Sequence, residues 1–221
     1  MEFVDYKCLE SLLIEGEELI ATKGIGNMIK GFMSKFFRII HDFFRAIASI
    51  FYKIGLKIRH KKILNGSSSI AGDGVTANSV KLDRIANECT KCSFTVYDIV
   101  DEFTHYGKLT VISNLVNKLK IDCEAYNELT NKFIEQLNDK PLVIAAGTQK
   151  NVSEVFEKVA IRCSESADKM NDVIKKIEFG MYREDEATEL QKYMNSVTKY
   201  SQMILMNVNK LTPIVNNAII Q

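Results

Sequence analysis

Apolar residues recur at spacings of three and four along most of the chain, and this spacing predicts helices. Four such segments follow one another after residue 79, over 82–103, 112–137, 152–177 and 190–211, and each gathers its apolar residues on one helical face. We therefore predict an all-α protein with an antiparallel four-helix-bundle-like core over about residues 79–215. In the first segment the apolar face consists of Leu82, Ile85, Ala86, Cys89, Cys92, Val96, Ile99, Val100 and Phe103.

Polar and glycine-containing breaks set the expected ends of these helices. The turns are expected near Gly107, around Asp139–Lys150 and at Gly180. Ser79 and Asp185 have the side chains of helix N-caps, so they are expected to begin the first and last helices of the bundle.

The longest break contains one apolar run, LVIAAG at Leu142–Gly147. It is short enough for a strand, but the sequence offers no obvious partner strand. The following AAGTQKN lacks the second glycine and the Ser or Thr after lysine that a phosphate-binding loop requires. It is interpreted as a loop before a helix.

A helical hairpin is expected ahead of the bundle, over residues 1–64. It would combine an acidic helix at 2–21 with a basic amphipathic helix at 27–64. The Gly- and Ser-rich stretch 65–79 has almost nothing to bury, so it is expected to be a linker. Residues 80–221 would then form the helical bundle.

The basic amphipathic helix carries an unusually aromatic apolar face. The charged residues Lys35, Arg38, Asp42, Arg45 and Lys53 fall on the opposite half of the helical wheel. These charges also interrupt every window of about 20 residues that could span a bilayer, so no transmembrane helix is expected. The apolar half consists of Ile29, Phe32, Met33, Phe36, Phe37, Ile40, Phe43, Phe44, Ile47, Phe51 and Ile54.

Two kinds of contact suit such a helix. It can pack against protein, in its own bundle or on another subunit, or it can lie on an anionic membrane with its rings in the acyl boundary. The sequence favours packing in a protein assembly and keeps membrane binding as the alternative. The expected partner- or membrane-binding residues are Phe32, Phe36, Phe37, Ile40, Phe43, Phe44, Ile47, Phe51, Lys35, Arg38, Arg45 and Lys53.

Charge is distributed unevenly at this end of the chain. Residues 1–23 carry six acids against two lysines, a net charge of −4, whereas residues 24–64 carry nine basic residues against one acid, a net charge of +8. Because the whole chain nets only +1, this asymmetry indicates an interacting surface. Folding the acidic helix back on the basic one would match the two charges.

The sequence predicts no catalytic site, no metal site and no cofactor. Five cysteines in a long chain are not a secreted disulfide framework. The pair Cys89 and Cys92 lacks a second ligand pair, since the nearest candidates, His105 and Cys123, lie on helices at no diagnostic spacing. Both cysteines fall on an apolar helical face, so they are interpreted as buried small hydrophobic residues.

The cluster KIRHKK at Lys57–Lys62 could neutralise phosphates, but no recognition fold accompanies it and the sequence pI is about 7.6. We interpret it as a solvated helix end, where cations suit the helix dipole. Specific nucleic-acid binding is not expected.

Together these features predict a non-enzymatic structural or assembly protein that contacts other subunits as a homo- or hetero-oligomer. The Ile-, Lys- and Asn-rich composition is common in products of AT-rich genomes, including large bacteriophages, so a virion component is expected. The acidic start MEFVDYKCLE does not resemble a secretory signal, which predicts a cytoplasmic protein or one assembled into a virion in the cytoplasm.

Overall fold

Five long helices make up almost all of the structure, a computed structural model that describes residues 25–63, 73–105, 108–176 and 184–221. The few other elements are two strands of two residues and one short 3-10 helix, η2 (Ala146–Thr148). The all-α prediction is therefore confirmed. The helices are α2 (Ile25–His60), α3 (Asp73–Thr104), α4 (Leu109–Leu137), α5 (Gln149–Lys176) and α6 (Glu184–Asn216), and the strands are β1 (Val143–Ile144) and β2 (Ile219–Ile220).

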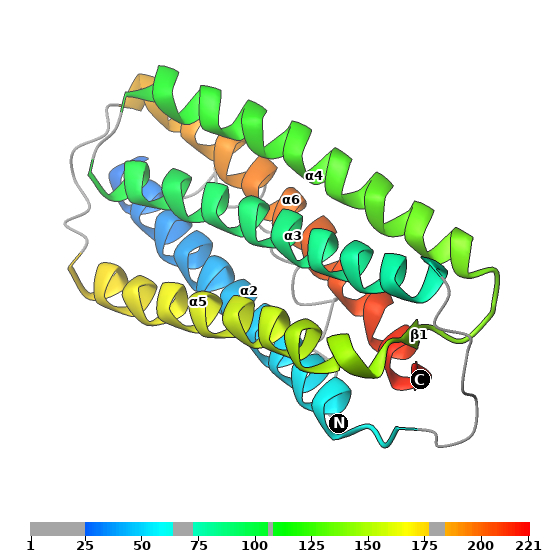
Figure 1. The fold of residues 1–221 in the computed structure, drawn as a ribbon. Coiled ribbons are helices and arrows are strands. Elements are labelled where there is room, and N and C mark those ends of the chain that lie inside the picture. Colours follow the sequence, from blue (N-terminus) through cyan, green and yellow to red (C-terminus); the bar gives the residue numbers. More distant parts are fainter. Residues whose placement is uncertain (1–24, 64–72, 106–107, 177–183) are drawn as a thin grey trace.

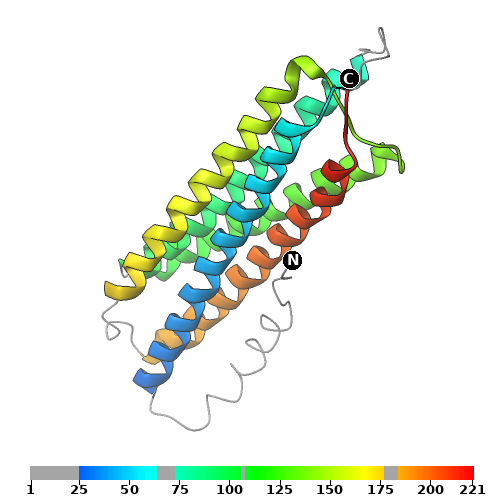
Figure 2. The ribbon, with the colours of Figure 1, turned by 90° about the horizontal axis from the view of Figure 1, so that it is seen from below.

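The five helices form one elongated bundle in which consecutive helices run in opposite directions (Figure 1). Around the bundle the neighbours are α5, α2, α6, α4 and α3, and α3 packs in turn on α5. Seen from below, α2 lies between α5 and α6 along its length (Figure 2). Helix α3 also contacts α6, so it packs on three of the other helices.

The apolar faces expected from the sequence form the core. All nine apolar residues predicted for 82–103 are buried in α3. On α4 the buried residues keep the same spacing, because every third or fourth side chain returns to the inner face. A single hydrophobic core joins residues from all five helices.

Helix α2 is one wall of this bundle, which differs from the expected separate hairpin at 1–64 joined by a linker to a four-helix core. Its buried side chains belong to the same core as those of α3–α6. The apolar face of the helix finds its partner inside the chain, since α5 and α6 cover it. The expected acidic helix 2–21 lies outside the described residues.

The last part of the linker expected at 65–79 is helical, because α3 already begins at Asp73. Ser79 is therefore inside the helix and is not its N-cap. Its buried hydroxyl lies 2.7 Å from the hydroxyl of Thr148. Asp185 falls in the first turn of α6, which begins at Glu184.

The apolar run after α4 does form a strand, and its partner strand lies 76 positions later in the chain. Strand β1 pairs in parallel with β2, and Ile220 also bridges to Ile63 just after α2. The amide of Ile219 donates to the carbonyl of Leu142 at 2.7 Å. This small sheet ties together the ends of α2, α4 and α6 at one end of the bundle (Figure 1).

Candidate interaction surface on helix α2

The aromatic residues expected to meet a partner or a membrane lie in the chain's own core. Phe37, Phe44 and Phe51 are 0% exposed. Phe32 is partly buried and packs against the same core. The other members of the predicted apolar set are buried as well, namely Phe36, Ile40, Phe43 and Ile47.

Ring contacts tie this face to two other helices. The ring of Phe36 meets that of Phe103 on α3 edge-on, with centroids 5.4 Å apart. Phe51 meets Phe156 on α5 in the same way, at 5.3 Å. Edge-on aromatic pairs add stabilisation beyond the area they bury. The aromatic face of α2 therefore holds the bundle together.

Helices α2 and α5 lie close together at Gly55. A Cβ atom at this position would lie 3.0 Å from the carbonyl oxygen of Ser153 and 2.8 Å from Cγ of Glu157. Only a residue without a side chain lets the two backbones come this near. At Gly31, by contrast, a Cβ would meet nothing within 4 Å.

The C-terminal end of α2 is capped by a side chain from the first turn of α5. The amide nitrogen Nε2 of Gln149 donates to the carbonyl oxygens of Ile58 at 2.7 Å and Lys61 at 3.0 Å, and lies 3.3 Å from that of Arg59. The last carbonyls of a helix lack partners within it, so this donor satisfies groups that would otherwise depend on water.

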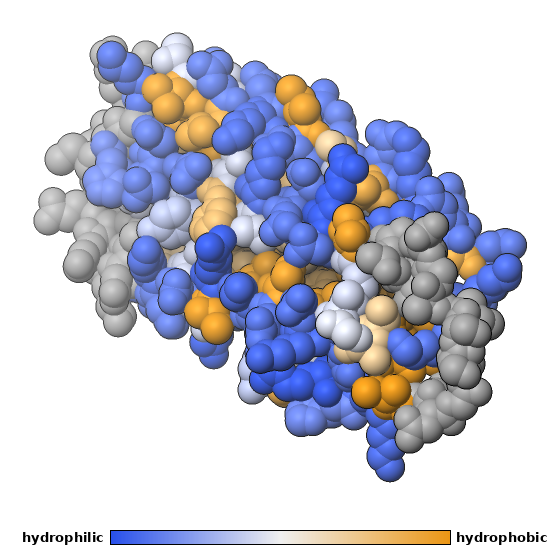
Figure 3. Space-filling view, viewed as in Figure 1, coloured by the Kyte–Doolittle hydropathy of each residue, from blue (hydrophilic) through white to orange (hydrophobic). Residues whose placement is uncertain are grey.

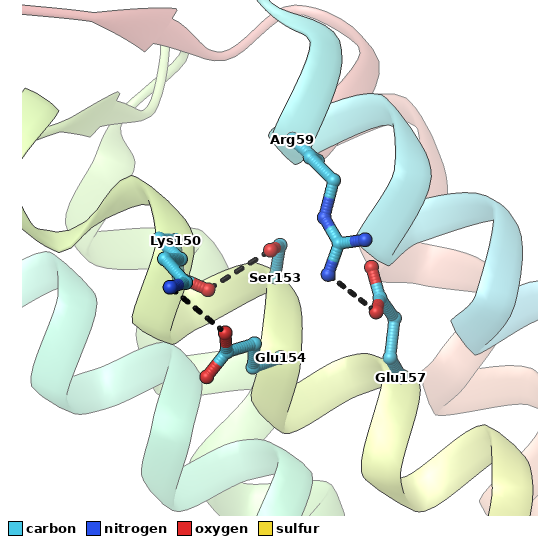
Figure 4. A network of polar contacts seen from close by, with 5 residues as sticks. All are labelled: Arg59, Lys150, Ser153, Glu154 and Glu157. Carbon is cyan, nitrogen blue, oxygen red and sulfur yellow. Dashed lines mark hydrogen bonds and ion pairs between the residues drawn. The ribbon is translucent and has the colours of Figure 1, made fainter.

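Three members of the basic cluster 57–62 have partners inside the chain. Arg59 forms an ion pair with Glu157 at 2.6 Å (Figure 4). The ammonium groups of Lys57 and Lys61 donate to the side chain and the backbone carbonyl of Asn216, at 2.5 and 2.8 Å. Lys61 therefore places its cation at the carboxyl end of α6, where the helix dipole favours it. These contacts give the cluster a role within the fold.

The four basic residues predicted for the interaction surface are all exposed. Lys35, Arg38, Arg45 and Lys53 lie on the outward face of α2, and we call this set the basic ridge. It extends over roughly 27 Å at 1.5 Å per residue. The single acid of the helix is Asp42, whose carboxylate lies 2.9 Å from the imidazole of His41.

The exposed large apolar side chains are distributed over several helices. On the face shown in Figure 3 the surface is mainly hydrophilic, with apolar groups scattered among charged ones. The exposed large apolar residues come from different helices, and single ones are normal on soluble domains. They include Tyr52, Val80, Phe94, Val111, Ile121, Ile161 and Met206.

The cysteines of the bundle are buried, as predicted for Cys89 and Cys92. Burial raises the pKa of the Cys89 thiol, and it raises the pKa of the Cys163 thiol to about 12. For Cys123 a hydrogen bond with Cys92, together with burial, raises the pKa. Because the thiolate is the reactive form, these groups are poor nucleophiles near neutral pH.

The described residues contain neither a cluster of metal ligands nor a helix that could span a membrane. Among them no group of three or more His, Cys, Asp or Glu side chains is placed to hold a metal ion. No helix within the described ranges is both long and apolar enough to cross a membrane. Comparison of the chain with protein-family models, curated proteins and solved structures found no match.

Proposed function

We propose that this chain is a non-enzymatic structural protein that binds an acidic surface of a partner subunit through the basic ridge. The observation that carries the proposal is the division of α2: its apolar residues are buried in the core, and its basic residues remain outside. The composition supports the further proposal that the assembly is a bacteriophage virion.

Charge and shape both support this use of the ridge. Its four cations lie on the exposed side of a helix whose other side is buried in the core, so little backbone order is lost when a partner binds. Rows of exposed like charges steer and orient partners more than they add affinity, and salt weakens their contacts. The proposed contact is therefore sensitive to ionic strength.

Membrane binding, the alternative from the sequence, would use the same helix differently. The rings that would enter the lipid are those that hold α2 against α3 and α5. The bundle would have to open before they could reach a bilayer. Binding through the ridge alone would instead leave the bundle closed, and its energy would come from cations near anionic headgroups.

The experiment that tests the proposal is the mass of the full chain in solution by light scattering, across protein concentration and ionic strength. The partner that we propose is a second copy of the chain, which is present in every sample of the protein. We expect association at low ionic strength and its loss in the triple variant R38E/R45E/K53E, because reversed charges repel the acidic surface.

A matched control reverses three exposed lysines on other faces of the bundle, K118E/K120E/K158E, with the same change in net charge. This control is expected to associate like the parent chain. A parent chain that stays monomeric at every concentration and salt would contradict the proposal. Flotation of that monomer with anionic vesicles would put the membrane alternative in its place.

A further inference from the structure

The basic ridge has an acidic counterpart in the same chain. Residues 1–23 carry a net charge of −4 and end two positions before the start of α2, whose exposed face carries Lys35, Arg38 and Arg45 against Asp42. We propose that this acidic segment docks on the basic ridge of its own chain. The proposal concerns the same ridge as the proposed function and states what occupies it when no partner is bound.

The lengths of the two segments agree. A helix over 2–21 would be about 30 Å long, and the same length along α2 reaches from Ile25 to about Arg45. After a reversal near Gly24 the acidic segment would therefore lie beside the first half of the ridge. Lys53 would stay uncovered and available to a partner.

The acidic segment has an advantage over a separate partner as the occupant of the basic ridge, because it belongs to the same chain. A segment joined directly to its binding site has an effective concentration on the order of millimolar, so weak contacts are enough to hold it. Its apolar residues Leu9, Leu12 and Leu13 would be able to contact Ile39 of α2, which is only partly buried. Docking would thus combine opposite charges with a small apolar contact.

A cross-link within the full chain tests this docking. In an antiparallel arrangement Cys8 would lie opposite the stretch 38–42, so the variant D42C places a second thiol beside it. A short bismaleimide, digestion and mass spectrometry would detect the link. The cysteines within the described bundle do not interfere, since all four are buried.

We expect an intramolecular link between Cys8 and the introduced thiol in D42C. Its yield should be about tenfold higher than in the control E124C, which places a thiol on the exposed face of α4, a helix that does not neighbour α2. Adding R38E and R45E to D42C should reduce the yield to the level of the control. High salt should do the same, because it screens exposed charges.

A yield equal to that of E124C would overturn the docking, and so would a yield unaffected by R38E and R45E. A link that joins two chains would assign the ridge to a second copy instead. Light scattering then separates the two proposals: association that depends on the ridge without any intramolecular link would leave the proposed function standing and the docking refuted.

Discussion

The two faces of α2 have opposite fates although their residues alternate along the same helix. Phe44 is 0% exposed in the core, and its neighbour Arg45 lies on the outer surface. One turn of helix thus carries a residue that maintains the fold and a residue that faces outward. An aromatic, amphipathic helix can look like a membrane or partner surface when the greater part of its apolar face belongs to the core.

The largest difference in the free energy of unfolding is expected between variants of Phe44 and variants of Arg45. Phe44→Ala should lower the free energy of unfolding by about 3–5 kcal/mol, because it removes a buried ring and leaves a cavity. Arg45→Ala should change it by about 0.5 kcal/mol or less, as is usual for surface substitutions. Denaturant unfolding of both variants measures the contrast. Equal effects would mean that the two faces are not divided as described.

A second contrast compares two glycines on the same helix. Gly55→Ala should destabilise the fold by about 1 kcal/mol, because the new methyl group is forced against the backbone of α5. Gly31→Ala should stabilise it by about 0.5–1 kcal/mol, since alanine is the better helix former and nothing is nearby. Thermal or denaturant unfolding gives both signs. A gain at both positions would show that α2 and α5 are farther apart.

The cap at the end of α2 should have an effect of similar or smaller size. Gln149→Ala removes the donor shared by the last carbonyls of the helix and should cost about 0.5–1.5 kcal/mol. Hydrogen exchange of the last turn of α2 should accelerate at the same time. Neighbouring Lys150→Ala, at an exposed position, serves as the control and should leave both quantities unchanged.

The smallest effect on stability is expected on the ridge itself. The double variant R38E/R45E should unfold within about 0.5 kcal/mol of the parent chain. Its association measured by light scattering should nevertheless fall, because the two charges face outward. A large loss of stability would mean that these arginines are part of the fold and would remove them from the proposed surface.

Much of the fold could be predicted from periodicity alone. The spacing of apolar residues located the inner faces of α2, α3 and α4, because a helix returns a side chain to the same face every third or fourth residue. It also separated Lys35, Arg38, Arg45 and Lys53 from the aromatic face, and these four residues are exposed.

Periodicity does not say what a buried face packs against. The division into hairpin and bundle was expected because 65–79 reads as a linker, yet α2 belongs to the same core as α3–α6. Contacts between distant residues gave no local signal either. The pairing of β1 with β2 and the capping of α2 by Gln149 join residues more than 70 positions apart.

Polar residues inside predicted apolar faces were missed for a related reason. Asp122 is buried on α4 because its carboxylate lies 2.7 Å from the ammonium of Lys91 on α3. A buried charge is acceptable when it is paired, but the partner can be found only once the two helices are in place.

In the proposed function the aromatic face of α2 stays in the core while its basic face contacts the partner. Hydrogen–deuterium exchange of the full chain, alone and with anionic vesicles, tests it most directly. We expect slow exchange of the backbone amides along Met33–Ile58 in both conditions, so that adding vesicles does not accelerate it. Faster exchange of this stretch when the chain binds vesicles would contradict it, because the aromatic face would then have left the bundle for the lipid.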